Sequence, residues 1–195
     1  LREETQFELM DLQMKLGLTF VVVTHDQEEA MTMADRIAVM DKGKVKQVAT
    51  PAEVYEAPNS KFVADFIGNV NMFEGTASTV MPGKVDIDVP ADRITIRTDA
   101  TRDCSTGQSV GFAIRPEKIR LSRKEPANTA VNAAHGELYD IAYFGDMTVF
   151  HVRLESGRII KAASLNAVRT VEDPLGYDDK VWVNFDTDAG ILLTA

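Results

Sequence analysis

The chain has 195 residues, of which 45% are apolar and 26% are charged, and its formal net charge is −9. This composition is typical of a globular protein, and no run approaches the roughly 18–20 apolar residues of a membrane-spanning helix. The acidic balance, without a basic stripe, argues against a surface that binds nucleic acid or anionic lipid.

The first residues predict a helix followed by a buried strand. Leu1 to Leu16 repeats its apolar residues at spacings of three and four, and Gly17 is a typical helix stop. The chain starts inside this helical pattern, without an initiator methionine or a signal peptide, so we expect it to be truncated. Phe20 to Val23 reads as a buried strand because its branched residues show no polar alternation.

A polar Thr-His-Asp corner at residues 24–26 closes that predicted strand. It places His25 at the carboxyl end of the strand, where open α/β sheets bind their ligands. From position alone, such a histidine is more often a hydrogen-bonded loop residue than a catalytic one. The aspartate of the corner is expected to cap a helix that runs to about Asp35. Glu28 and Glu29 in its first turn read as electrostatic caps and not as catalytic bases.

The next elements are short, and they end at a change of pattern. The expected elements are a hairpin of Arg36–Met40 and Val45–Val48, and two helices over Pro51–Glu56 and Lys61–Phe66. Gly68 to Asn71 breaks the pattern, so we place a domain boundary there, which gives domains of residues 1–68 and 69–195.

Short runs, separated by Gly, Pro, Asp or Asn, predict an all-β barrel or sandwich after the boundary. The expected strands are Met72–Val80, Lys84–Val89, Arg93–Arg97, Gln108–Arg115, Lys118–Ser122, Gly136–Ala142, Met147–Leu154, Arg158–Ala163, Lys180–Phe185 and Gly190–Leu193. Ser122–Ala134 is expected to be a loop. The aromatic residues Tyr139, Tyr143, Phe144 and Phe150 are expected in the core, and not on a base-stacking platform.

The remaining reactive side chains give no pattern typical of catalysis. Cys104 is the single cysteine, which excludes an internal disulfide and fits a reducing cytoplasm. With three scattered histidines it offers no zinc spacing. We expect His135 and His151 to be satisfied by solvent or by the core.

Several motifs, in one order, resemble the end of the ATPase domain of an ABC transporter. They are Leu16–Met40, Gly43-Lys44, Thr50-Pro51, Glu53, Tyr55, Pro58 and Phe66-Ile67-Gly68. Arg115-Pro116-Glu117, Tyr143–Asp146 and Val183–Asp188 resemble the regulatory OB-like (TOBE) domain that follows it in many importers. The join from Phe66 to Gly75 is most similar to the polyamine branch of the family, especially to putrescine importers.

The resemblance implies an α/β remnant of an ABC ATPase domain at residues 1–68 and an all-β OB-like barrel at residues 69–195. In this family the position of His25 is the switch histidine, which contacts the γ-phosphate and the attacking water of ATP. The chain has no Gly-x-x-x-x-Gly-Lys-Ser/Thr loop, and the family's signature motif and acidic strand are also missing. Cys104–Gln108 superficially resembles that signature, but it follows His25 instead of preceding it and reads as a turn. We therefore expect ATP and Mg in the intact subunit, and no cofactor or metal site in this chain.

The resemblance also implies partners. The intact subunit would form homodimers, drive transmembrane permease subunits and lie on the cytoplasmic face of the cell membrane. We expect the apolar faces of Leu9–Leu16 and Phe20–Val23 to be buried against a second copy, or exchanged with it. A regulatory or dimerisation module at residues 69–195, sensing a small ligand or a partner protein, is the main alternative. A nucleic-acid-binding OB protein is a third, which the acidic charge disfavours.

Overall fold

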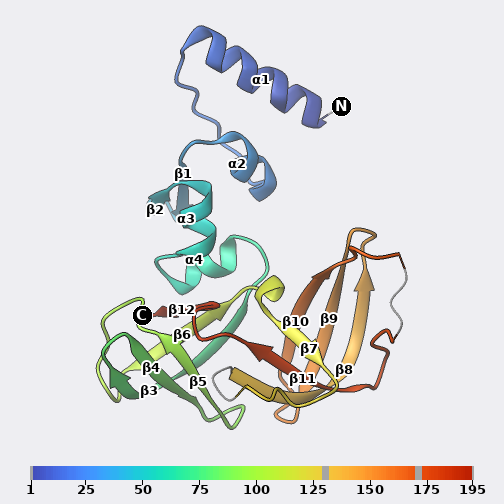
Figure 1. Ribbon diagram of the computed structural model, residues 1–195. Helices are drawn as coiled ribbons and strands as arrows, with labels where there is room; N and C mark the ends of the chain where they lie inside the picture. The colour runs from blue at the N-terminus through green and yellow to red at the C-terminus, as the bar shows by residue number, and fades with distance from the viewer. Residues whose placement is uncertain (1, 129–131, 170–172, 195) are drawn as a thin grey trace.

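The computed structural model describes residues 2–128, 132–169 and 173–194, and Figure 1 shows a helical N-terminal part above a β region. The N-terminal elements are α1 (Arg2–Leu16), α2 (Gln27–Met33), β1 (Ile37–Asp41), β2 (Lys44–Ala49), α3 (Pro51–Glu56) and α4 (Lys61–Phe66). None of the helices in the described ranges is long and apolar enough to span a membrane.

Within the described residues, the β region consists of two five-stranded sheets whose pairings are antiparallel. One sheet has the order β12-β6-β3-β4-β5 and the other the order β10-β9-β8-β11-β7. The strands are β3 (Asn71–Met81), β4 (Lys84–Val89), β5 (Ile94–Asp99), β6 (Ser109–Ile114), β7 (Arg120–Ser122), β8 (Asn132–Tyr143), β9 (Met147–Leu154), β10 (Ile159–Leu165), β11 (Lys180–Phe185) and β12 (Gly190–Leu193), with a 3-10 turn at Pro116–Lys118.

One core joins the two sheets. β4 alternates strictly, so that Val85, Ile87 and Val89 are all buried. The ring of Phe112, from β6, stacks on the ring of Phe185, from β11 in the other sheet, with centroids 5.7 Å apart. Sheets that bury one face each against the other form a self-contained domain. The all-β prediction for this region is therefore confirmed.

A second, smaller core holds the elements from α2 to α4 together. Val39 of β1, Val54 of α3 and Val63 of α4 are buried in it, and residues of α2 pack against them. Ala64 of α4 packs in the opposite direction, against Ala113 of β6 and against β12. The short helices α3 and α4 thus lie between α2 and the two-sheet β region (the barrel), as Figure 1 shows.

The predicted elements mostly match the observed ones. The bounds are identical for Pro51–Glu56, Lys61–Phe66, Lys84–Val89, Met147–Leu154, Lys180–Phe185 and Gly190–Leu193. The predicted loop Ser122–Ala134 ends early, because β8 begins at Asn132. The predicted helix start at Leu1, and residues 129–131 of that loop, lie outside the described residues.

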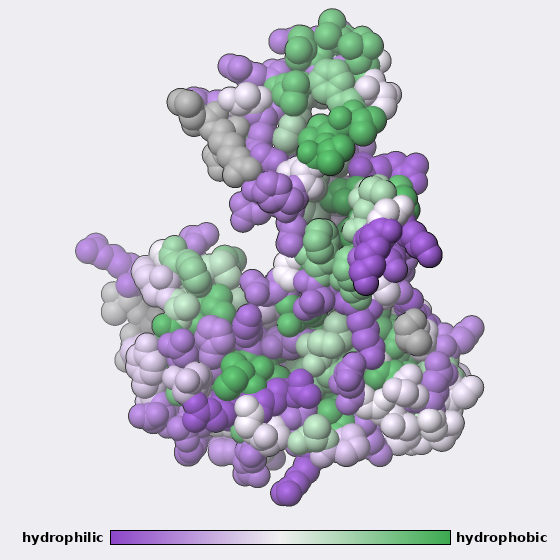
Figure 2. Space-filling view, turned by 180° about the vertical axis from the view of Figure 1, so that it is seen from behind, coloured by the Kyte–Doolittle hydropathy of each residue, from purple (hydrophilic) through white to green (hydrophobic). Residues whose placement is uncertain are grey.

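The predicted strand at Phe20–Val23 is wrong. This segment forms no strand, and Val21 and Val23 expose 88% and 94% of their surface. A strand needs a hydrogen-bonded neighbour, and no described strand lies alongside this segment. Exposed apolar residues of α1 continue the same surface, which is the green region at the top of Figure 2. These apolar faces are exposed in the single chain, and their burial against a second copy stays a prediction.

The predicted core position is wrong for three of the four aromatic residues. Tyr139, Tyr143 and Phe144 are exposed, while Phe150 is partly buried against the main core. Tyr139 lies on the outer face of β8, where its ring contacts the Arg153 guanidinium at 3.8 Å from the centroid. Tyr143 and Phe144 fall at the β8–β9 turn, where a side chain has no facing sheet to pack against.

Candidate functional site

The corner that contains His25 is fixed by its neighbours. The Thr24 hydroxyl donates a hydrogen bond to Glu29 (2.7 Å) and accepts one from the Asp26 amide (2.9 Å). Asp26 caps α2 by accepting from the Glu29 amide (3.1 Å). The His25 side chain is exposed, and among the described residues it has no hydrogen-bond or ion-pair partner. The structure therefore presents a free imidazole on a rigid corner.

The same corner does not fit a phosphate group by itself. The Glu29 amide at the N-terminus of α2 already donates to the Asp26 carboxylate, and Glu28 and Glu29 add further negative charge to the first turn, which opposes a bound phosphate. Within residues 2–128, 132–169 and 173–194, no group of three or more His, Cys, Asp or Glu residues could hold a metal ion.

Arg115 is the central residue of the junction between the short helices and the barrel. Only 5% of it is exposed, and it stands at the end of β6. One guanidinium nitrogen donates to the carbonyls of Ala64 (3.1 Å), Ile67 (2.5 Å) and Asn69 (3.1 Å), and the other donates to the Tyr55 carbonyl (3.1 Å). Carbonyls at a helix C-terminus lack partners within the helix and carry partial negative charge, so a guanidinium suits them well.

The short helices direct these carbonyls toward Arg115 because their starts are fixed. Thr50 and Glu53 form a capping box at the N-terminus of α3, which has proline in its first position. Ser60 caps α4 through the Val63 amide. Both helices have six residues, and they end at Glu56 and Phe66. Arg115 thus binds carbonyls at the C-terminal ends of two helices at once.

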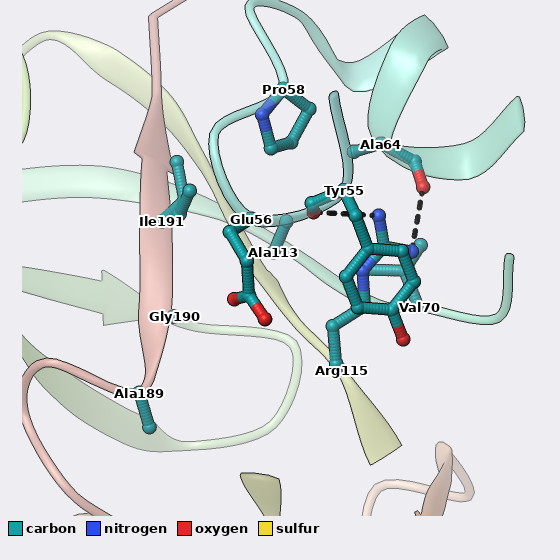
Figure 3. A pocket seen from close by; sticks show the side chains of 10 residues that line it. All are labelled: Tyr55, Glu56, Pro58, Ala64, Val70, Ala113, Arg115, Ala189, Gly190 and Ile191. Carbon is teal, nitrogen blue, oxygen red and sulfur yellow. Dashed lines mark hydrogen bonds between the residues drawn. The ribbon is translucent and has the colours of Figure 1, made fainter. Parts of the chain in front are cut away.

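Tyr55 and Glu117 complete the junction, and Figure 3 shows Tyr55 and Arg115 from close by. The Tyr55 ring lies 4.1 Å from the Arg115 guanidinium carbon, and its hydroxyl donates to Glu117 at 2.8 Å. Burial, followed by the hydrogen bond to the Glu117 carboxylate, raises the pKa of Tyr55 to about 12. Burial lowers the pKa of Arg115, although the nearby acidic groups oppose this. Lys118 and Glu56 add an ion pair at the rim (3.1 Å).

The junction is tightly packed and is not a ligand pocket. The hollow beside Tyr55 and Arg115 measures about 20 Å³. A volume of this size holds one water molecule and nothing larger. The role of the junction is therefore mechanical: it fixes the helices on the barrel.

The other histidines and the cysteine lie outside both places. The exposed His135 ring makes an edge contact with Trp182. His151 is partly buried, and its Nδ1 has no hydrogen-bond partner in the described structure. The expectation that solvent or the core satisfies this histidine is therefore wrong for that atom. Cys104 is free, and the Cys104–Gln108 stretch forms a turn, as predicted.

A larger hollow, of about 610 Å³, lies between the β4–β5 turn and the sheet that contains β11. Arg93, His135 and Trp182 are among its lining residues. Arg93 has a positive φ of 56°, and its guanidinium has no hydrogen-bond or ion-pair partner among the residues the structure describes. A hollow of this volume is large enough for a small ligand.

Sequence reasoning found His25 and the Arg115 motif, but it missed what Arg115 and Gln27 bind. The Gln27 side chain donates to the Phe66 carbonyl and accepts from the Gly68 amide (2.7 Å). These two contacts join residues that are 39 and 41 positions apart, so no local spacing in the sequence indicates them. Only the resemblance of Arg115-Pro116-Glu117 to a family motif pointed to this region.

Comparison with known proteins gives matches over the whole chain. The TOBE domain family model matches residues 112–193. The putrescine transport ATP-binding protein PotG of Escherichia coli (strain K12) is 42% identical over 194 residues, which cover 100% of this chain and 51% of that protein. The spermidine/putrescine import ATP-binding protein PotA of Nitrosospira multiformis is 36% identical over 197 residues, covering 99% of this chain and 53% of that protein. The chain spans about half the length of these relatives and matches their C-terminal part.

A solved structure shares the fold of the β region. The cytoplasmic molybdate-binding protein ModG, with molybdate bound, superimposes with a TM-score of 0.58 and 18% identity, covering 64% of this chain and 96% of that chain. At this identity the likeness shows the fold alone, which is an all-β, OB-like fold.

Proposed function

Because this chain contains a TOBE domain and matches the C-terminal part of the ATP-binding proteins of polyamine importers, we propose that it is the C-terminal portion of such a subunit. The 42% identity to PotG, continuous over 194 residues, is the observation that carries the proposal. The intact subunit would hydrolyse MgATP to drive import of putrescine or a related polyamine. Residues 1–68 would be the end of its ATPase domain, and residues 69–195 its regulatory domain.

His25 would be the switch histidine of the intact subunit. The rigid corner at Thr24 and Asp26 supports this role, because phosphoryl transfer depends mainly on positioned groups. A free and exposed imidazole is also available to contact a γ-phosphate and a water held by other parts of the subunit. This chain alone would neither bind nor hydrolyse ATP, since nothing in its sequence cradles a triphosphate.

The exposed apolar surface of α1 and residues 18–23 supports the proposed assembly. A contiguous patch of this kind is uncommon on a soluble monomer. In the intact subunit it would be covered by the rest of the ATPase domain, or by a second copy that exchanges this segment. The dimer would act on permease subunits at the cytoplasmic face of the membrane.

The test compares a subunit of the relatives' full length, ending in this chain, with its His25→Ala variant. MgATP turnover is expected in the first and a loss of at least about 100-fold in the second, the size of effect of removing a positioned charge-stabilising group. His135→Ala is the matched control and is expected to leave turnover unchanged. Full activity of the His25 variant would disprove the role of His25. Micromolar ATP affinity of the isolated 195-residue chain would disprove its predicted inability to bind ATP.

A second candidate function is that the barrel senses a small ligand or a partner. The hollow with the unpaired Arg93 guanidinium favours a ligand that carries negative charge. A ligand that binds only the folded state raises the melting temperature. Phosphate is a suitable probe: a rise that is absent in Arg93→Ala would support this function. The absence of any rise, with a melting temperature that depends on protein concentration, would favour dimerisation only.

A further inference from the structure

The turn from Phe66 to Asn69 is held from both sides, by residues of the two different parts of the molecule. From the N-terminal side, the Gln27 amide donates to the Phe66 carbonyl and accepts from the Gly68 amide at 2.7 Å. From the barrel side, Arg115 donates to the Ile67 and Asn69 carbonyls at 2.5 and 3.1 Å. Gln27 thus holds Phe66 and Gly68, and Arg115 holds Ile67 and Asn69.

This double hold leaves the turn little freedom. The Gln27 amide has one possible orientation, because a carbonyl needs its NH₂ group and an N–H needs its oxygen. Gly68 has a φ of 72°, and a Cβ at this position would lie 3.3 Å from the Tyr55 ring and 3.7 Å from the Arg115 guanidinium. Displacement of Arg115 must therefore either move the turn or leave buried carbonyls without donors, which is costly.

Gln27, which contacts the turn, is close to His25 along the chain. Gln27 is the first residue of α2, and only Asp26 separates it from His25. The corner is tied to α2 by the cap from Asp26 to Glu29 and by the Thr24 hydroxyl. A movement of the Gln27 backbone therefore carries the His25 backbone with it, because the intervening residues are hydrogen-bonded in place.

We propose that the Phe66–Asn69 turn is the relay by which the β-barrel sets the position of His25, and that Gln27 is a positioning residue for this histidine. The relay itself consists of Arg115, the turn and Gln27. Its consequence for ATP hydrolysis rests on the proposed function. A regulatory domain that changes its contacts at Arg115 would then adjust the switch histidine without touching the nucleotide.

The test uses the 195-residue chain and needs no nucleotide. The chain has three histidines, so the His25 ring signals can be assigned in a ¹H–¹³C NMR spectrum. Arg115→Lys is expected to shift the His25 signals in the wild-type background and to leave them unmoved in a Gln27→Ala background. The same shift in both backgrounds, or no shift in either, would overturn the relay. If Arg115→Lys does not fold, Gly68→Ala displaces the same turn and must show the same dependence on Gln27.

The chain offers two matched controls. Gln47 holds a neighbouring turn in the same way, donating to the Ala57 carbonyl (3.2 Å) and accepting from the Asn59 amide (2.7 Å). A Gln47→Ala background is expected to keep the response of His25 to Arg115→Lys. Arg97→Lys changes an arginine paired with Asp86 on the barrel surface, and it is expected to leave the His25 signals unmoved. A loss of the response in Gln47→Ala would indicate general loosening and would count against the relay.

A second measurement separates the relay from the proposed function. In a full-length subunit that ends in this chain, Gln27→Ala is expected to lower kcat for ATP about 10-fold with KM unchanged, as misplacement of a catalytic group does. An equal rise in KM without loss of kcat would contradict the positioning role. If the full-length subunit shows no ATP turnover while the NMR dependence holds, the proposed function fails and the relay stands.

Discussion

Val85 and Val89 in the barrel are completely buried, whereas Val21 and Val23 in the N-terminal segment are almost completely exposed. All four are valines, so the type of side chain does not explain the difference. In the barrel, β4 has β3 and β5 as hydrogen-bonded neighbours and a facing sheet across the core. Residues 18–23 have no neighbouring strand in the described structure.

This contrast shows which part of the molecule is complete in itself. The barrel closes its own core, as an independently stable domain must. The N-terminal segment carries an exposed apolar surface, and the chain spans about half the length of its relatives. The elements from α2 to α4 are intermediate, because their small core is supplemented by the contacts to Arg115.

The largest expected effect comes from removing a ring from the barrel core. Phe112→Ala deletes a completely buried side chain that contacts Phe73 and Phe185, and it should lower the free energy of unfolding by about 3–5 kcal/mol. Val23→Ala, in the exposed segment, should change it by less than about 0.5 kcal/mol. Urea denaturation followed by the fluorescence of Trp182, the single tryptophan, measures both values. A similar loss in the two variants would break the contrast between the regions.

The barrel could be predicted better than the N-terminal segment for the same reason. In strands such as Lys84–Val89, alternation between apolar and polar residues reports a face that is buried within the chain itself. The run at Phe20–Val23 has no hydrogen-bonded neighbour among the described strands, so the pattern predicted an element that does not form here. The core prediction for Tyr143 and Phe144 was wrong for a different reason. An apolar side chain does not show from the sequence alone whether its residue lies in a strand or at a turn.

Contacts of long sequence separation could not be predicted at all. The order of the strands within each sheet, the role of Arg115 as a helix cap and the contact of Gln27 with the Phe66–Asn69 turn depend on three-dimensional packing. The His25 corner is the opposite case, since its cap at Asp26 is local and was predicted. The catalytic role of His25 remains a prediction.

A smaller effect is expected at the junction. It tests whether the elements from α2 to α4 are intermediate in stability between the barrel and the exposed N-terminal segment. Gly68→Ala forces an L-residue into a φ of 72° and brings a Cβ to 3.3 Å from the Tyr55 ring. Gly83→Ala, in the β3–β4 turn, meets the same kind of backbone strain at a φ of 77° with nothing within 4 Å. We expect losses of about 2 and about 1 kcal/mol, since the left-handed conformation alone costs roughly 1–2 kcal/mol. Equal losses in urea denaturation would mean that the junction is loosely packed.

The last expected effect, which is reduced because Tyr55 is only partly buried, is a dependence on pH that arises from the junction. Tyr55 has a pKa of about 12 in the folded chain and about 10 when unfolded. Between these values the unfolded state has lost a proton that the folded state retains, so the free energy of unfolding falls as the pH rises from about 10 to about 12. Below pH 10 this contribution is fully present.

Tyr55→Phe removes that contribution while it keeps the ring beside Arg115. The difference in the free energy of unfolding between wild type and Tyr55→Phe is therefore expected to shrink between pH 10 and pH 12, as measured by urea denaturation at several pH values. Tyr177→Phe, at an exposed position, is the control for the number of tyrosines. Parallel curves for wild type and Tyr55→Phe would show that Tyr55 is not shielded by the Arg115 junction. The short helices would then be less firmly fixed on the barrel than the contacts of Arg115 indicate, and their stability would resemble that of the exposed N-terminal segment.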